Sequence, residues 1–185
     1  QYPYWLAQQD EFTRTFLDSQ AFNACRQNFV LLPDASGRWL GVLAVIGEQD
    51  DPYAVAHLPK LLPKHSYHRC PDSPATLSAD NFLLGWGLGA YRFDRYRTTE
   101  KPEAKPSVTT VQVAAGDPAA AARAFAPLSA VADAVVFARD LVSEPSNVLH
   151  PEDYAKRCQS LTRLGLEIEV LGEAEMAKLG MGSLL

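Results

Sequence analysis

The sequence predicts an α/β fold in two parts, a small N-terminal domain over residues 1–97 and the start of a second α/β domain over residues 108–185. Two strand-like runs around a glycine-containing turn indicate a hairpin within residues 28–46. Residues 98–107 hold no apolar side chain besides alanine and proline, which is typical of a linker. After the linker, helix and strand patterns alternate, as they do when helices cover a sheet.

The composition is that of a soluble globular protein. Of 185 residues, 47% are apolar and 21% are charged, and the formal net charge is −5. No apolar run approaches the roughly 20 residues that cross a bilayer, and the N-terminus lacks the basic and apolar sequence of a signal peptide. We therefore expect a cytoplasmic protein with no membrane partner. Because the chain begins with Gln1 rather than methionine, we also expect its true N-terminus to lie earlier.

The elements of the first part follow from local patterns. Apolar residues near helical spacing predict an amphipathic helix within residues 1–23. The hairpin strands are predicted at 28–33 and 39–46, around a turn that contains Gly37. The apolar pattern of residues 51–62 predicts short helical turns, which Pro59 is expected to interrupt.

One segment, residues 65–70, gathers His65, His68 and Cys70, with His57 upstream. Such residues can bind zinc, but they lack the paired spacing of a structural zinc site and have no acidic residue close by. We interpret the segment as a polar strand leading to a turn at 71–74. The three cysteines are odd in number and widely spaced, so we expect reduced thiols.

A helix is predicted over residues 82–91, capped by Ser78 and neighbouring polar residues, despite three glycines. Gly85, Gly87 and Gly89 do not form a dinucleotide-binding loop, which needs a G-x-G-x-x-G turn between a strand and a helix. Gly85 and Gly89 share one helix face, so we expect them to let a neighbouring element approach closely.

A basic run interleaved with aromatic residues follows this helix. The pattern also occurs on nucleic-acid surfaces, but a solvated helix end followed by a charged linker is the plainer interpretation, and we do not expect nucleic acid as a partner. The residues concerned are Arg92, Arg95, Arg97, Lys101 and Lys105, with Tyr91, Phe93 and Tyr96.

The second part is predicted to begin with a strand at 108–113 and a long helix at 119–142, which Pro127 kinks or divides. Glu144-Pro145 ends this helix, and Pro151 starts the next, over 151–164. A strand at 166–171 and a helix at 173–179 complete the pattern. Two strands with helices on one side leave sheet edges open, so we expect other protein to cover residues 117–185.

Three segments carry a resemblance to a known family. Residues 88–96 contain Tyr91-Arg92-Phe93-Asp94-Arg95-Tyr96, and residues 165–185 follow a strand, helix and glycine-rich turn pattern. Around the end of the long helix stand Ala138-Arg139-Asp140-Leu141-Val142, Pro145, Asn147, Leu149 and Pro151. These segments resemble the leucyl (cytosol) aminopeptidases, in which a helix ends in an "ARDLV-N-x-P-x-N-x-L-x-P" pattern. Here Ser143-Glu144 replaces the more usual Asn-Thr pair.

The resemblance implies an accessory α/β domain followed by the first part of an α/β catalytic domain. It implies a metal-dependent aminopeptidase that releases N-terminal residues, often leucine, from peptide substrates, as a cytoplasmic homo-oligomer, a hexamer. The family holds two divalent ions, manganese or zinc, in a glycine-rich segment with Lys and Asp and in an "NTDAEGR" segment. Neither motif occurs in this sequence. We therefore assign no catalytic, metal or substrate-binding residue here, and expect the stretch alone to be inactive and to bind no metal.

Two alternatives remain at this point. The polar loop contains the groups of a Ser–His–acid triad, although no G-x-S-x-G motif is present, in Ser143, Glu144, Ser146, Asn147, His150 and Asp153. We interpret Ser143, Ser146 and Asn147 as satisfying backbone groups, Glu152 and Asp153 as opposing the helix dipole, and Arg139 and Asp140 as a structural pair. The second alternative is a non-catalytic binding module of the same architecture.

Overall fold

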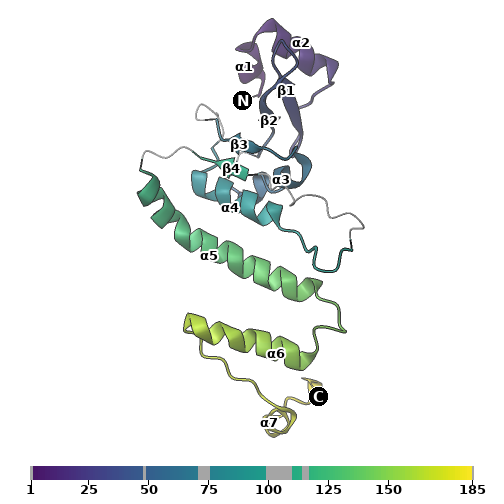
Figure 1. The fold of residues 1–185 in the computed structure, drawn as a ribbon, viewed down its shortest axis with the longest axis vertical. Helices are drawn as coiled ribbons and strands as arrows, with labels where there is room; N and C mark the ends of the chain where they lie inside the picture. The colour runs from purple at the N-terminus through teal and green to yellow at the C-terminus, as the bar shows by residue number, and fades with distance from the viewer. Residues whose placement is uncertain (1, 48, 71–75, 99–109, 114–116, 185) are drawn as a thin grey trace. The chain divides into compact units, whose positions relative to one another are not determined.

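The computed structural model describes residues 2–47, 49–70, 76–98, 110–113 and 117–184. They form two compact units, Gln1–Val136 and Phe137–Leu185. The first unit contains α1 (Tyr2–Ala7), α2 (Glu11–Ser19), β1 (Phe29–Pro33), β2 (Trp39–Ala44), η1 (Pro52–Ala54), α3 (Leu58–Leu61), β3 (Ser66–His68), α4 (Ala79–Ala90), β4 (Thr110–Gln112) and most of α5 (Pro118–Ser143) (Figure 1). The second contains α6 (Pro151–Gln159), η2 (Ser160–Leu164), α7 (Glu173–Lys178) and η3 (Gly182–Leu184).

The N-terminal helix predicted within residues 1–23 is two helices, α1 and α2, in the structure. The side chain of Asp10 accepts a hydrogen bond of 2.7 Å from the main-chain N–H of Thr13. An aspartate in this position satisfies a main-chain donor at the start of a helix and so favours a new start over a continuous helix. The same hydrogen bond lowers the pKa of Asp10.

The predicted hairpin is confirmed. β1 and β2 pair antiparallel, with Leu31 opposite Val42, and Gly37 in the turn has φ +81°. The Asp34 side chain accepts hydrogen bonds from the N–H groups of Ser36 (2.8 Å) and Arg38 (2.9 Å), which hold the turn closed. One face of the hairpin packs on the core through Phe29, Leu31, Val42 and Ala44.

The second sheet is a parallel pair, β3 and β4, with Tyr67 opposite Val111. The predicted strand at 65–70 is thus confirmed, while its turn at 71–74 lies outside the described residues. Parallel neighbours need a crossover connection, and α4 lies between them in sequence, so β3, α4 and β4 form a β-α-β arrangement. The pairing places β4 in the first unit, rather than with the segment that follows the predicted linker.

The glycines of α4 serve packing, as expected. Gly85 lies against the main-chain carbonyl of Pro52 and Gly89 against that of Ala56, so close that a Cβ at either position would overlap backbone atoms. A Cβ at Gly87 would meet nothing within 4 Å. The close approach brings Trp86 into the core, which it forms with Ala54, Val55, Leu58, Leu62 and Leu77. Pro59 stands in the first turn of α3, so it helps to start that helix instead of interrupting it.

α5 continues through Pro127, so the predicted division of the long helix at this proline is wrong. α6 begins at Pro151 as predicted and passes into the 3₁₀ turn η2. The predicted strand at 166–171 is also wrong: residues 166–171 pair with no other strand in the described part of the second unit. A strand exists only through a hydrogen-bonded neighbour, and the described residues 137–184 offer none.

The apolar side chains of α5 and the second unit remain uncovered in the described residues. No residue of α5, α6 or α7 is buried. Val142 is 87% exposed, Leu179 63% and Leu184 67%. α5 is long and apolar enough to cross a membrane. Core helices of soluble proteins meet the same criteria of length and composition. No continuous apolar run of that length was expected from the sequence, because charged residues such as Arg123 and Asp133 interrupt it.

Candidate functional site

The His/Cys segment around β3 does not assemble a metal site in the described residues. His65, His68 and Cys70 lie along one wall of an apolar cavity of about 830 Å³. Among residues 2–47, 49–70, 76–98, 110–113 and 117–184, no group of three or more His, Cys, Asp or Glu side chains is placed to hold a metal ion. Cys25, Cys70 and Cys158 are free thiols. Weak metal affinity of this segment stays a prediction, tested below.

His57, the remaining member of that segment, lies in apolar surroundings. Its ring lies 6.4 Å from that of Phe29, centroid to centroid. Both ring nitrogens are buried, and neither has a hydrogen-bond partner in the part of the chain that the structure describes. Burial therefore lowers the pKa of His57 and favours the neutral imidazole. We therefore expect His57 to affect the pH dependence of stability and assign it no catalytic role.

The loop after α5 is closed by its own backbone. The N–H groups of Val148 (2.9 Å) and Leu149 (3.0 Å) both donate to the carbonyl of Pro145. A main-chain turn therefore satisfies these two N–H groups, and the expectation that Ser143, Ser146 and Asn147 satisfy other backbone groups of the loop stays a prediction. Glu152 and Asp153 stand in the first turn of α6, as predicted for residues that oppose the helix dipole.

A Ser–His–acid triad is not formed in this loop. His150 is the N-cap residue of α6, and its side chain makes no capping hydrogen bond. Asp153 pairs with Lys156 at 3.5 Å instead of approaching the imidazole. Within the described residues, no hydrogen bond joins Ser143 or Ser146 to His150. The loop thus has a structural part, and no nucleophile with an activating base is placed there.

The most buried polar side chain of the second unit, that of Glu144, was not among the functional residues expected from the sequence. The Glu144 side chain has no exposed surface, and its Oε1 accepts hydrogen bonds from Nη1 and Nη2 of Arg157 at 3.3 and 3.4 Å. The pair joins the end of α5 to α6, and thereby fixes the loop between them. Glu144 stands where the resembled pattern has threonine. In this chain the glutamate at that position is paired with Arg157. Nothing local in the sequence links two residues that far apart.

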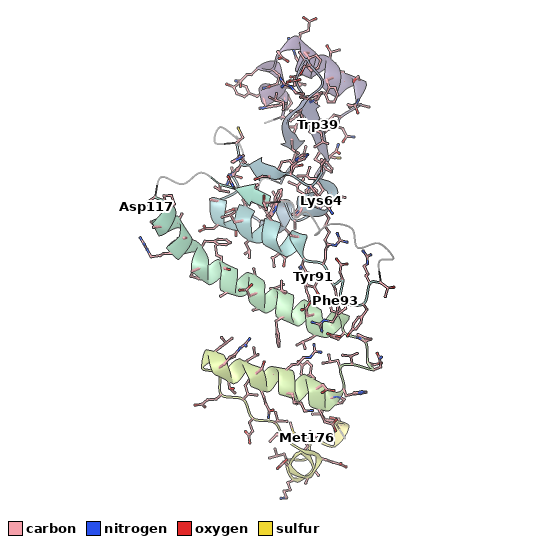
Figure 2. The ribbon with its side chains drawn as sticks, in the orientation of Figure 1. Trp39, Lys64, Tyr91, Phe93, Asp117 and Met176 are labelled. Atoms are coloured by element: carbon pink, nitrogen blue, oxygen red, sulfur yellow. The ribbon has the colours of Figure 1, made fainter. Side chains whose placement is uncertain are left out.

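The positive charge of the basic run after α4 is partly neutralised by Asp94, which lies within the run. Asp94 forms ion pairs with Arg92 (3.0 Å) and Arg97 (3.5 Å). The guanidinium of Arg95 lies 5.6 Å from the ring centre of Phe93, and Figure 2 shows Tyr91 and Phe93 just beyond α4. These contacts favour the interpretation as a solvated helix end over a nucleic-acid surface, which stays untested. Lys101 and Lys105 lie outside the described residues.

Matches to two domain families, which follow one another along the chain, identify the class of protein. Residues 1–108 match the family described as "M17 aminopeptidase, N-terminal domain". Residues 136–185 match the "Cytosol aminopeptidase family, catalytic domain". The chain belongs to the M17, or cytosol aminopeptidase, family. This confirms the resemblance drawn from the sequence, and its restriction to the N-terminal portion.

Curated relatives and solved structures agree with this assignment. A probable cytosol aminopeptidase of Caulobacter vibrioides is 66% identical over 108 residues, 58% of this chain and 22% of the relative. One of Nitrobacter hamburgensis is 42% identical over 148 residues, 78% of this chain and 27% of the relative. The chain thus spans about a quarter of the length of these relatives.

Among solved structures, the cytosol aminopeptidase of Coxiella burnetii aligns over 87% of this chain and 33% of its own, with a TM-score of 0.67 at 21% identity. This confirms the predicted fold class, an α/β accessory domain followed by the start of an α/β catalytic domain. The bottromycin maturation enzyme BotP, in complex with Mn, aligns over 89% of this chain and 37% of its own, with a TM-score of 0.60 at 26% identity.

Proposed function

We propose that residues 1–185 are the N-terminal portion of a metal-dependent aminopeptidase that releases N-terminal residues, with a preference for leucine, from peptides. The observation that carries this proposal is the order of the two domain matches, residues 1–108 and then 136–185, on one chain. The helix, loop and helix from Ala138 to Arg157, with α5 ending at Ser143 and α6 starting at Pro151, stand inside the second match.

The metal ions of the proposed enzyme, two divalent ions such as manganese or zinc, do not fit the residues described here. The buried acid of the second unit, Glu144, is engaged by Arg157, and no cluster of three ligand-type side chains occurs among the described residues. We therefore derive no catalytic step from this stretch. The manganese named for BotP supports metal dependence in a similar protein. The proposed role of residues 1–185 is to begin the catalytic domain and attach the accessory domain to it.

The same proposal includes a cytoplasmic homo-oligomer, a hexamer. The names of the relatives, cytosol aminopeptidases, support the location. The uncovered apolar side chains of α5 and the second unit are consistent with burial in a larger protein or assembly. Light scattering on the complete polypeptide tests the assembly, and a monomer at micromolar concentration contradicts it.

The function is tested with the complete polypeptide and a leucyl chromogenic amide. The complete polypeptide should hydrolyse the amide, lose activity on chelation and recover it when manganese or zinc is returned. Residues 1–185 alone should give no hydrolysis. A complete polypeptide that folds, yet cleaves neither leucyl nor other aminoacyl amides with either metal, would favour the non-catalytic binding module instead.

A further inference from the structure

The apolar cavity of the first unit collects all three tryptophans of the chain. Trp5 of α1, Trp39 of β2 and Trp86 of α4 line this cavity of about 830 Å³. The β1–β2 hairpin and the β3–β4 pair stand next to each other in Figure 1, and residues of both line the cavity. Volumes of about 300–1,000 Å³ with mostly apolar and aromatic walls are typical of small-molecule sites. The cavity therefore has the size and the lining of a ligand site.

The charges around this cavity have one sign. Among the described residues that line it there is no aspartate or glutamate, although the chain holds 22 acidic and 17 basic residues. The lining residues that can carry a positive charge, His65, His68 and Arg69, lie in or beside β3. The hairpin contributes residues 31–32 and 39–44, none of which has an ionisable side chain. The cavity thus joins an apolar wall to a wall that favours an anion.

Arg69 is held at this wall by contacts of its main chain and its side chain. Its N–H donates to the carbonyl of Gln112 (2.9 Å), which fixes its main chain to β4. Its Nη2 donates to the carbonyl of Leu77, and its guanidinium lies 5.2 Å from the ring centre of Phe82. A guanidinium has several N–H donors, and the hydrogen bonds found among the described residues use Nη2 alone. Arg69 can therefore donate to an acceptor inside the cavity.

Asp50 is an acidic residue that the charge of Arg69 reaches, but it lies outside the lining. The pKa of Asp50 is lowered mainly by the hydrogen bond that its carboxylate accepts from the N–H of Ser78 (2.8 Å), and the positive charge of Arg69 lowers it further. Asp50 is not among the residues that line the cavity. Its carboxylate is thus engaged at the start of α4, and Arg69 brings its positive charge to a cavity without an acid of its own.

We propose that this cavity binds an amphipathic carboxylate, a small molecule with an apolar body and one carboxylate group, which Arg69 holds at the β3 wall. The apolar body lies against the tryptophans and the hairpin, where its removal from water is favourable. The carboxylate accepts charge-assisted hydrogen bonds from the guanidinium, which are stronger than those between neutral groups. A cation of the same shape lacks these bonds. The site belongs to the first unit and does not rest on the proposed peptidase function.

Calorimetric titration of the complete polypeptide with decanoate, below the concentration at which it forms micelles, tests the proposal. Decanoate should bind saturably at a single site. Decyltrimethylammonium, which has the same apolar chain and the opposite charge, should bind about tenfold or more weakly, because it forms no hydrogen bond with a charged donor. Decanoate should also change the tryptophan fluorescence over the same concentration range, since Trp39 lines the cavity and is 63% exposed.

Arg69→Gln should weaken decanoate binding about tenfold or more, because it removes the charged donor. His68→Glu places a negative charge on the same wall and should also weaken it. If Arg69→Gln does not fold, His68→Glu decides, because His68 is exposed and its replacement leaves the contacts of Arg69 in place. His150→Glu, exposed and outside the cavity, is the matched control and should bind decanoate like the unchanged protein.

Equal affinity for decanoate and decyltrimethylammonium overturns the proposal, because it indicates a cavity without preference for an anion. Decanoate binding that neither Arg69→Gln nor His68→Glu weakens overturns it as well, and so does binding without a change in fluorescence. A complete polypeptide that binds no decanoate also contradicts it, because other residues or a second copy then fill the cavity. Peptidase activity in the absence of decanoate bears on the proposed function and not on this site.

Discussion

The carboxylate of Glu144 accepts two hydrogen bonds from the guanidinium of Arg157, at 3.3 and 3.4 Å, in a position where the Glu144 side chain has no exposed surface. Removing one partner of a buried pair leaves a charge without this compensation. We predict that Arg157→Met lowers the free energy of unfolding of the complete polypeptide by about 3 kcal/mol, the lower end for buried pairs because Arg157 is 29% exposed. Denaturant unfolding measures the change.

The adjacent Lys156 provides the control for this prediction. Its ion pair with Asp153 is 3.5 Å long, and its side chain is 72% exposed, so Lys156→Met should cost less than about 1 kcal/mol. The double variant Glu144→Thr with Arg157→Met should recover part of the loss, because it removes the buried charge itself. Similar losses for Arg157→Met and Lys156→Met would contradict the account.

Alanine at Gly85 or Gly89 should destabilise the first unit, because its Cβ would overlap the carbonyls of Pro52 or Ala56. Overpacking of this kind costs about 1–3 kcal/mol. Gly87→Ala is the matched control in the same helix. Its Cβ would point into open space, so it should stabilise the helix by up to about 1 kcal/mol. Thermal melts of the three variants give the order, and a loss at Gly87 as large as at Gly85 would argue against the packing described for α4.

His57 should make stability depend on pH. Burial lowers its folded-state pKa below the usual 6.5, so the unfolded state takes up a proton first as the pH falls. Stability is therefore complete above pH 6.5 and decreases below it, by at most about 1.4 kcal/mol per pH unit for one proton. His57→Leu should remove this loss, whereas His150→Leu, at an exposed position, should keep it. Unfolding curves above and below pH 6.5 compare the variants.

Three carboxyls titrate in a separate, more acidic range. Hydrogen bonds lower the pKa of Asp10, Asp34 and Asp50 below their usual 3.8. Their contribution is present above that value and is lost as the pH falls through the folded-state values. Neither His57 nor these carboxyls should lower stability between neutral pH and pH 6.5. If the free energy of unfolding of His57→Leu falls in that range, another group must be the cause.

The boundary between the two domains stays a prediction at residues 98–107, of which only Thr98 lies among the described residues. This segment has no apolar side chain besides alanine and proline, so we expect a protease to cut it first. Limited proteolysis followed by mass spectrometry locates the cut. First cuts within residues 120–142 would place the boundary in α5 instead.

Local signals predicted most of the first unit. Ser78 caps α4 by accepting a hydrogen bond from the N–H of Asn81 at 3.2 Å, as its residue type indicated. Gly37 provides the hairpin turn, and in the second unit Pro151 likewise begins α6. These features depend on a few neighbouring residues, which is why sequence patterns contain them. The break between α1 and α2 was missed because apolar spacing outweighed the capping signal of Asp10.

Features that depend on distant residues could not be predicted. Alternation of Leu166, Ile168 and Val170 indicates a segment with two faces, but it does not say whether a second strand lies beside it. The burial of Glu144 requires the turn that brings Arg157 back to the end of α5.

Calorimetric titration with zinc and with manganese tests the central claim, that this chain is the N-terminal portion of a metal-dependent aminopeptidase whose ligands lie elsewhere. The complete polypeptide should bind two equivalents of metal, while residues 1–185 should bind neither metal tightly at a defined stoichiometry. A stoichiometric, submicromolar zinc site in residues 1–185 that disappears when His65 and His68 are both replaced would contradict it.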